Sequence, residues 1–260
     1  MIYKIENRLN EYVAGYLDSL SPMPHIHPHL ELVYLKDGSS MVTLDNQTHL
    51  LEAGDLFLAF PNQIHFYQDQ APPFGFIIIF SPDIFRELKE LFHSQTPTSP
   101  IIKAPLLPPD LFERMVEIRT RCRSESPFDK IAAKGCLLTL LADLLPLMDL
   151  SPNTSTQDSI RNILRYCSEN YTEPLTLDIL AKNVNLSKYH ISHMFKERLN
   201  LSFTDFINNL RTEHACQLLK ENASVTDAAF SSGFTSIRNF NHVFLKIMGM
   251  TPREYLKSQQ

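Results

Sequence analysis

Residues 31–80 alternate between short apolar runs and turn-forming residues. The runs are Leu32–Leu35, Met41–Leu44, Leu56–Phe60 and Phe76–Phe80. Short strands at such intervals are typical of a β-sandwich or a β-barrel. Between the runs, Asp37-Gly38 and Asp45-Asn46 predict hairpin turns, because these residue types adopt positive φ angles at little cost.

From Asp110 the apolar residues follow a helical period. Leu111, Met115 and Ile118 fall on one face of a first helix, and Ser126-Pro127 separates it from a second helix. The second helix is apolar over more than one face, at Leu137, Leu138, Leu140, Leu141, Leu144, Leu145 and Met148. A surface this wide predicts that part of the helix containing Leu137, Leu141 and Leu144 covers the β-rich domain and part of it contacts a second copy of the chain.

The segment Ser151–Gln157 contains no apolar residue and is predicted to be a turn-forming linker. The chain is accordingly divided into a β-rich domain at 1–108, a helical dimerisation segment at 109–150, the linker at 151–157 and a second domain at 158–260. The expected fold class is multi-domain α+β, with an all-α second domain.

The second domain contains an internal repeat. The stretch 180–195 aligns with 228–244, first at an offset of 48 residues and then, after one extra residue, at 49. Each copy has a short helix with a small Ala, then Asn185 or Gly233, then a second helix with apolar positions at i, i+3 and i+4. Ala allows close helix crossing and Asn or Gly tolerates positive φ, so each copy predicts a helix-turn-helix.

Capping residues predict the remaining helices. Ser202 and Asp205 indicate the start of a helix over Phe203–Asn222, which separates the two copies, and Asn200 and Gly249 are expected to end the two second helices. Thr251-Pro252, followed by Glu254, predicts a last helix. A spacer of about 20 residues would be ~30 Å long, close to the ~34 Å between successive major grooves on one DNA face.

Charge is distributed unevenly between the domains. Residues 1–157 hold 12 Lys and Arg against 19 Asp and Glu, a net −7, whereas residues 158–260 hold 12 against 10, a net +2. A relatively basic half favours a nucleic-acid partner.

The first twenty residues carry charges throughout, and the longest apolar stretch, 136–148, is interrupted by Asp143 and Pro146. A secretory signal and a membrane anchor are therefore not expected, and the cytoplasm is the expected location.

The four cysteines are expected to be reduced thiols, because they form no CxxC pair that would indicate zinc or redox chemistry. They are Cys122, Cys136, Cys167 and Cys216.

The second helix of each copy carries polar residues of types that bind base edges and phosphates. The candidate DNA-binding residues are Lys188, Tyr189, Ser192, His193 and Lys196 in the first copy and Ser236, Arg238, Asn239 and His242 in the second.

The stretch Leu175–Leu256 resembles the AraC/XylS family of transcription regulators. The family signature is matched at Gly233, Phe234, Ser236, Phe240, Phe244, Gly249, Thr251 and Pro252. The resemblance implies that Tyr189, Ser192, His193, Arg238 and His242 face the bases. His193 and His242 stand where the family often has Arg, and Leu245 where it often has Lys, so the resemblance does not supply the usual guanine contact or one of the phosphate contacts.

A histidine-rich motif lies at the start of the β-rich region. His25, His27 and Glu31 precede Gly38, and Gly54-Asp55 is followed by Pro61 and His65. This pattern resembles the cupin barrel, in which two His, a Glu and a later His converge on one metal. Three imidazoles and a carboxylate suit Fe, Mn, Ni or Zn. Alternation along a strand would place His25, His27 and His29 on one face, although His29 is outside the motif and is expected at the rim or surface.

Three roles are open for this motif. His25, His27, Glu31 and His65 either hold a divalent metal, line a pocket for a small polar effector such as a sugar, or are purely structural. The resemblance to cupin-like sensor domains favours the effector pocket, with no cofactor required.

The sequence thus predicts a transcription regulator rather than an enzyme, with a cupin-like sensor barrel and two helix-turn-helix units. Its expected partners are double-stranded DNA, a small-molecule effector, a second copy of the chain and, for an activator, RNA polymerase. The competing hypotheses are an effector-independent architectural DNA-binding protein and a DNA-tethered, metal-dependent cupin enzyme. Effector identity, the operator sequence and the sign of regulation do not follow from the sequence.

Overall fold

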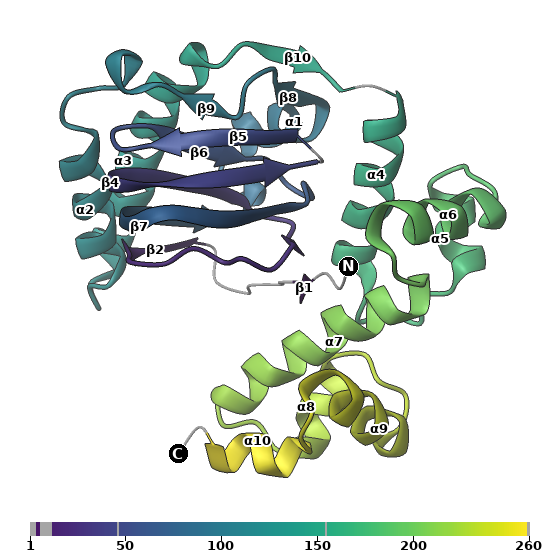
Figure 1. The fold of residues 1–260 in the computed structure, drawn as a ribbon. Helices are drawn as coiled ribbons and strands as arrows, with labels where there is room; N and C mark the ends of the chain where they lie inside the picture. Colours follow the sequence, from purple (N-terminus) through teal and green to yellow (C-terminus); the bar gives the residue numbers. More distant parts are fainter. Residues whose placement is uncertain (1–3, 6–11, 46, 154, 259–260) are drawn as a thin grey trace. The chain divides into compact units, whose positions relative to one another are not determined.

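The computed structural model describes residues 4–5, 12–45, 47–153 and 155–258. The chain forms two compact units, one of residues 10–158 and the other of residues 1–9 with 159–260. The first unit is β-rich with packed helices, and the second is helical (Figure 1). No helix among the described residues is long and apolar enough to span a bilayer.

The β-rich unit is built on an antiparallel sheet around two long strands, β4 (Leu30–Leu44) and β7 (His65–Phe80), which pair along most of their length. β4 also pairs with β5 (Gln47–Glu52) and β6 (Leu56–Ala59), and β6 with β9 (Ile101–Ile102). β7 also pairs with β2 (Tyr12–Leu17) and β3 (His25–Ile26). This is the predicted cupin-like arrangement, with strands longer than the apolar runs suggested.

Both faces of the first part of β4 are buried, which explains the apolar run Leu32–Leu35. Leu30 and Leu32 belong to a core that the sheet shares with the helices, whereas Val33 and Leu35 belong to a second core on the opposite face. Because side chains alternate along a strand, Glu31 shares the second face with Val33. A carboxylate is thereby placed on a face that is otherwise apolar.

The prediction of a hairpin turn at Asp37-Gly38 is wrong. β4 continues through these residues, and the pairing register with β7 shifts on both sides of Asp37. Gly38 has a φ of +79°, and a Cβ there would lie 2.2 Å from the Pro72 carbonyl oxygen. The glycine is therefore part of a β-bulge rather than of a hairpin turn. The turn predicted at Asp45-Asn46 is present, since Leu44 pairs with Gln47 and Asp45 has a φ of 46°. Asn46 itself lies outside the described residues.

The helices of this unit are α1 (Arg86–Ser94), α2 (Leu111–Cys122) and α3 (Pro127–Leu144). α2 packs on α3 and on β2 and β7 (Figure 1). Ser126-Pro127 separates α2 from α3 as predicted, and Ser126 caps α3 by accepting a hydrogen bond from the Asp129 amide, with Pro127 in the first turn. Short 3-10 turns occupy Pro82–Ile84, Ala104–Leu106 and Leu145–Leu147.

The segment predicted as a linker has regular structure at both of its ends. Ser151 and Pro152 lie in β10 (Leu150–Pro152), which pairs with β8 (Gln95–Pro97), and α4 (Ser155–Asn170) begins at Ser155. Polar composition alone did not reveal this, because an edge strand and a first helical turn both tolerate polar residues. Residue 154 lies outside the described part of the chain.

The helical unit contains α4 and six further α-helices among the described residues. They are α5 (Leu177–Asn183), α6 (Lys188–Met194), α7 (Phe203–Lys220), α8 (Val225–Ser231), α9 (Ile237–Met248) and α10 (Pro252–Ser258), with a π-helical turn at Phe195–Leu199. The predicted capping residues are confirmed. Ser202 accepts from the Asp205 amide, Asn200 and Gly249 are left-handed, and the Thr251 and Glu254 side chains accept each other's backbone N–H groups. The short strand β1 (Lys4–Ile5) groups with this unit.

Candidate functional sites

The two helix-turn-helix units have the same local construction. α6 and α9 are capped by Ser187 and Ser236, which lie 49 residues apart, whereas the preceding turns at Asn185 and Gly233 lie 48 apart. The extra residue seen in the sequence alignment is therefore in the second turn, at Thr235, and leaves both helices intact. In each turn the amide that follows the left-handed residue binds a carbonyl of the first helix, Leu186 to Ala181 and Phe234 to Ala229, both at 3.1 Å.

Apolar residues of α6 and α9 fix the orientation of their polar faces. Ile191, Met194, Phe240, Val243 and Phe244 are buried. All nine candidate DNA-binding residues are exposed: Lys188, Tyr189, Ser192, His193, Lys196, Ser236, Arg238, Asn239 and His242. Leu245, which stands where the family often has Lys, is also exposed.

Some of these exposed residues have partners on the same surface. Tyr189 is 80% exposed and stacks on His193, whose ring lies 3.2 Å from the Glu197 carboxylate. Lys188 forms an ion pair with Asp178 at 2.8 Å. Arg238 makes no hydrogen bond or ion pair with any described residue, so its guanidinium is available to a ligand. The Ser236 hydroxyl caps α9 by accepting a hydrogen bond from the Asn239 amide, which leaves its O–H able to donate to a ligand.

Arg211 stabilises the helical unit in a way that sequence reasoning missed. It lies on α7, and its Nε and Nη2 donate hydrogen bonds to the carbonyl oxygens of Tyr171 and Glu173 at 2.7 and 2.8 Å. These carbonyls follow the end of α4. A guanidinium with two donors in one plane suits such a pair of acceptors, but no local sequence signal identifies them.

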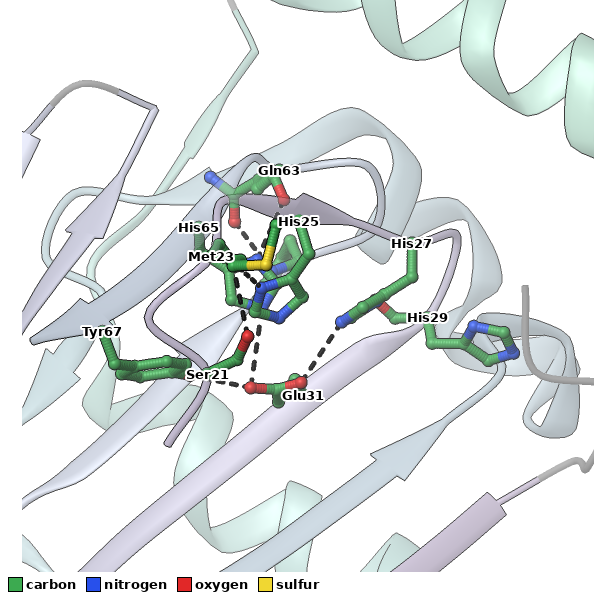
Figure 2. A network of polar contacts seen from close by, with 10 residues as sticks. Ser21, Met23, His25, His27, His29, Glu31, Gln63, His65 and Tyr67 are labelled. Atoms are coloured by element: carbon green, nitrogen blue, oxygen red, sulfur yellow. Dashed lines mark hydrogen bonds and ion pairs between the residues drawn. The ribbon is translucent and has the colours of Figure 1, made fainter. Parts of the chain in front are cut away.

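A second candidate site lies inside the β-rich unit, where the structure brings together four predicted residues, His25, His27, Glu31 and His65. One ligand atom from each falls within 4.8 Å of all the others, and the residues are at most 4% exposed. His25 comes from β3, His27 from the loop that follows, Glu31 from β4 and His65 from β7 (Figure 2). His25 and His65 are direct cross-strand partners.

His29 is not part of this cluster, and the expectation that it lies at the surface is wrong. It is 5% exposed, and its ring points away from Glu31 in Figure 2. β3 ends at Ile26, so the strand alternation that would place His29 beside His25 and His27 does not continue. Its backbone carbonyl nevertheless contributes to the cluster, because it lies 3.1 Å from the Nδ1 of His27.

Each histidine of the cluster turns its Nδ1 toward a backbone carbonyl. The partners are Met23 for His25, His29 for His27 and Gln63 for His65, at 3.0, 3.1 and 3.0 Å. A carbonyl only accepts hydrogen bonds, so a neutral ring keeps its single proton on Nδ1 and has a lone pair on Nε2. The Nε2 of His27 lies 3.2 Å from Glu31 Oε2, and that of His65 lies 3.5 Å from Glu31 Oε1.

Tyr67 is the other polar partner of Glu31, and sequence reasoning missed it. Its hydroxyl donates to Glu31 Oε1 at 2.7 Å, and burial raises its pKa well above the usual value, so it remains a donor. Tyr67 follows His65 by two residues on β7 and therefore shares its face. That spacing was visible in the sequence.

The charges in the cluster are unequally distributed. Burial lowers the pKa of His25 to about 4, with the neighbouring His65 adding to the effect, so His25 is neutral at neutral pH. Burial also opposes a charge on His65, but the Glu31 carboxylate outweighs it and raises the pKa of His65. Burial alone would raise the pKa of Glu31, yet the neighbouring His65 and His27 hold it well below its usual range. Glu31 is therefore an anion that needs positive charge beside it.

The chain matches two protein-family descriptions. An AraC-like ligand binding domain covers residues 12–141, and a helix-turn-helix domain covers residues 180–258. A ligand-binding domain joined to a helix-turn-helix domain defines a class of one-component transcription regulator. The chain belongs to the AraC family of these regulators.

Relatives that match along most of the chain are also regulators. The HTH-type transcriptional regulator YfiF of Bacillus subtilis is 24% identical over 96% of this chain and 85% of its own length. The Msm operon regulatory protein of Streptococcus mutans is 26% identical over 91% of this chain and 87% of its own. A crystal structure of ToxT from Vibrio cholerae covers 95% of this chain and 98% of its own, with a TM-score of 0.57 at 14% identity, and so supports the fold.

Proposed function

We propose that this AraC-family regulator binds specific DNA through α6 and α9, and that an effector in the β-rich domain controls its activity in the cytoplasm. The DNA-binding role is supported by the two helix-turn-helix units. Their second helices have the same kind of serine cap, and both present an exposed polar face. α7, which connects them, has 18 residues and is therefore about 27 Å long. That length is comparable to the ~34 Å between successive major grooves, so one chain is expected to contact two grooves.

The effector is proposed to be a small polar molecule sensed by the β-rich domain. One relative, the Melibiose operon regulatory protein of Escherichia coli, is 30% identical over 42% of this chain and 37% of its own length. The name of this relative supports a sugar as one candidate class. The cluster of His25, His27, Glu31 and His65 is closed in this conformation, with exposures of 0–4%, so a ligand of sugar size could enter only if the barrel rearranged.

A second copy of the chain is proposed to pack on α3, on the face opposite Leu137, Leu141 and Leu144. Leu137, Leu141 and Leu144 are fully buried in the core that α3 shares with the sheet, so they are not available to a partner. The opposite face presents the exposed residues Phe128 (79%), Ile131 (67%), Gly135 and Ala142, and at its edge the partly buried Leu138, which also packs against the core. Their alternating spacing of three and four residues is that of a coiled-coil seam.

The function is tested by selecting fragments of the source genome that bind the full-length chain. We expect a defined set of fragments, bound at least about tenfold better than bulk DNA, with an affinity that falls steeply as salt rises because bound phosphates release counterions. Genes beside these fragments would indicate the class of effector. Binding that does not distinguish sequences would contradict the proposal and favour an architectural role.

A further inference from the structure

We infer that Glu197 is a positioning residue for base recognition by the first helix-turn-helix unit. Its carboxylate orients the His193 ring so that Nε2 accepts a hydrogen bond from an exocyclic amino group in the major groove, the N6 group of adenine or the N4 group of cytosine. This role rests on the proposed binding of specific DNA through α6. It adds the chemical group that α6 reads and a residue that determines the choice.

Two neighbours hold the His193 ring. The Tyr189 ring stacks on it, with the ring centroids 6.0 Å apart and an angle of 27° between the planes, and Glu197 Oε2 lies 3.2 Å from its Nδ1. One face and one edge of the imidazole are therefore in contact with residues of the same surface. The His193 side chain is nevertheless 49% exposed, and none of the described residues forms a hydrogen bond or an ion pair with its Nε2. The Nε2 edge is available to a ligand.

The Glu197 carboxylate determines which ring nitrogen carries the proton. A carboxylate oxygen only accepts hydrogen bonds, so a neutral imidazole beside it keeps its single proton on Nδ1 and has a lone pair on Nε2. The Glu197 side chain is 62% exposed, and exposed ion pairs contribute little because water screens them. The contribution of Glu197 is therefore to the tautomer and the orientation of the ring.

A hydrogen-bond acceptor on α6 selects among the base edges. In the major groove, guanine presents only acceptors, at N7 and O6, whereas the N6 group of adenine and the N4 group of cytosine are donors. A lone pair on Nε2 matches these two amino groups and is mismatched with the guanine acceptors. His193 is thus expected to favour an adenine or a cytosine on the strand that it contacts.

The second copy of the repeat has a histidine at the same place but no carboxylate. At the offset of 49 residues, His193 corresponds to His242 on α9, and Glu197 corresponds to Lys246. Lys246 forms an ion pair with Asp205 on α7 at 3.1 Å. Both copies form a helix-turn-helix unit with opposite charges at this position, so the fold does not require an acid there. The Glu197 carboxylate is free to act on His193.

The test uses the full-length chain at pH 8, where histidine side chains are ordinarily uncharged, and a DNA fragment selected from the source genome. Each adenine of the fragment is replaced in turn by purine, and each cytosine by pyrimidin-2-one, which lack only the amino group. At one position we expect this deletion to weaken binding by about 3–10-fold, the effect of one hydrogen bond. His193→Ala should abolish the effect at that position. Replacement of adenine or guanine by its 7-deaza analogue, which lacks the N7 acceptor, should show no dependence on His193.

Variants of Glu197 separate positioning from a purely structural role. Glu197→Ala should lose most of the amino-group effect at the same position, and the double variant with His193→Ala should lose no more than His193→Ala alone. Glu197→Gln should restore part of the effect, because its amide oxygen still accepts the Nδ1 proton. Since Glu197→Ala also removes a negative charge near the phosphates, its affinity for non-specific DNA should rise slightly, so the lost preference would not reflect general weakening.

His193→Arg tests whether residue 193 contacts a base. Arg binds the N7 and O6 atoms of guanine in a bidentate manner, so the variant should change the preference at this position to guanine. Glu221→Ala is the control for loss of a negative charge, because Glu221 is exposed at the end of α7, outside both recognition helices. It should retain the whole amino-group effect.

Two results would overturn the inference while leaving specific DNA binding intact. One is a His193-dependent loss of affinity with the 7-deaza analogues instead of the amino-deleted bases, which would show that the ring donates. The other is a full amino-group effect in Glu197→Ala, which would show that the carboxylate does not position the ring. If the folded, unaltered chain selects no fragment at all, the proposed DNA-binding function fails together with this inference.

Discussion

Gly233 lies directly against the backbone of Thr172. A Cβ on Gly233 would come within 2.6 Å of the Thr172 carbonyl oxygen, and the glycine has a φ of +92°. The turn of the second helix-turn-helix unit is thus packed on the segment that follows α4. Any side chain at this position meets both backbone strain and a steric clash.

We expect Gly233→Ala to destabilise the helical unit by about 2–4 kcal/mol, from an unfavourable φ and from a contact that only backbone movement can relieve. The measurement is chemical denaturation followed by circular dichroism at the helical wavelength. Gly249→Ala is the matched control, because Gly249 also has a positive φ, +69°, but nothing lies within 4 Å of its added Cβ. It should cost only about 1 kcal/mol, and equal effects of the two changes would show that the Thr172 contact is unimportant.

The helical unit was largely predictable from sequence because its signals are local. Caps such as Ser202 and Thr251 and left-handed residues such as Asn185 and Gly249 act within a few positions of themselves, and each was found where expected. Arg211 was not predictable, since its acceptors are backbone carbonyls about 40 residues away. A hydrogen bond to a carbonyl puts no constraint on the partner's side chain.

The β-rich unit was less predictable because its strands depend on distant pairing. Asp37-Gly38 has the composition of a hairpin turn, and only the register of β7 against β4 shows that it is a bulge. The cluster histidines were identified by spacing, but the same alternation also placed His29 on their face, which is wrong because β3 has only two residues. For α3, a helical period could not decide which apolar face the sheet would cover.

Arg211→Ala should lower the stability of the helical unit by about 1–3 kcal/mol, because it removes two charge-assisted hydrogen bonds and leaves the Tyr171 and Glu173 carbonyls without this donor. Arg211→Lys should recover only part of the loss, since one ammonium does not reproduce the planar pair of donors. Both variants can be compared by thermal melting. Full recovery by Lys would show that charge rather than geometry is important.

Thiol labelling should distinguish the four cysteines. Burial raises the pKa of Cys216 to about 11 and also raises that of Cys167, so neither forms much of the reactive thiolate at pH 8. Cys122 and Cys136 are only half-buried. Iodoacetamide applied to the native chain at pH 8 should modify these two first, as followed by mass spectrometry. Denatured protein, in which all four react, is the control, and early modification of Cys167 would contradict its burial.

Charge placed on the exposed face of α3 should separate the proposed dimer without unfolding the domain. We expect Ile131→Glu to shift the chain from dimer to monomer in sedimentation at tens of micromolar, while its melting temperature changes little, because Ile131 is 67% exposed. Leu141→Glu is the contrasting variant. It buries a carboxylate in the core and should unfold the β-rich unit rather than dissociate a dimer. A monomeric unaltered chain would remove the proposed interface.

Arg238→Ala tests recognition by the second helix-turn-helix unit. The guanidinium is exposed on α9, and a bidentate contact of Arg to guanine is worth about 1–3 kcal/mol of discrimination. We therefore expect the variant to bind the selected fragment about 5–150-fold more weakly and to lose its preference at one base position, with its melting temperature unchanged.

Lys220→Ala is the control for loss of a positive charge, since Lys220 is exposed at the end of α7, outside both recognition helices. It should leave base preference intact and weaken binding at most slightly and equally for all sequences. The two variants differ in the pattern of the loss as well as in its size. If Arg238→Ala instead weakened binding to every sequence equally, its guanidinium would contact phosphate rather than a base, and base recognition by α9 would have to come from Asn239 and His242.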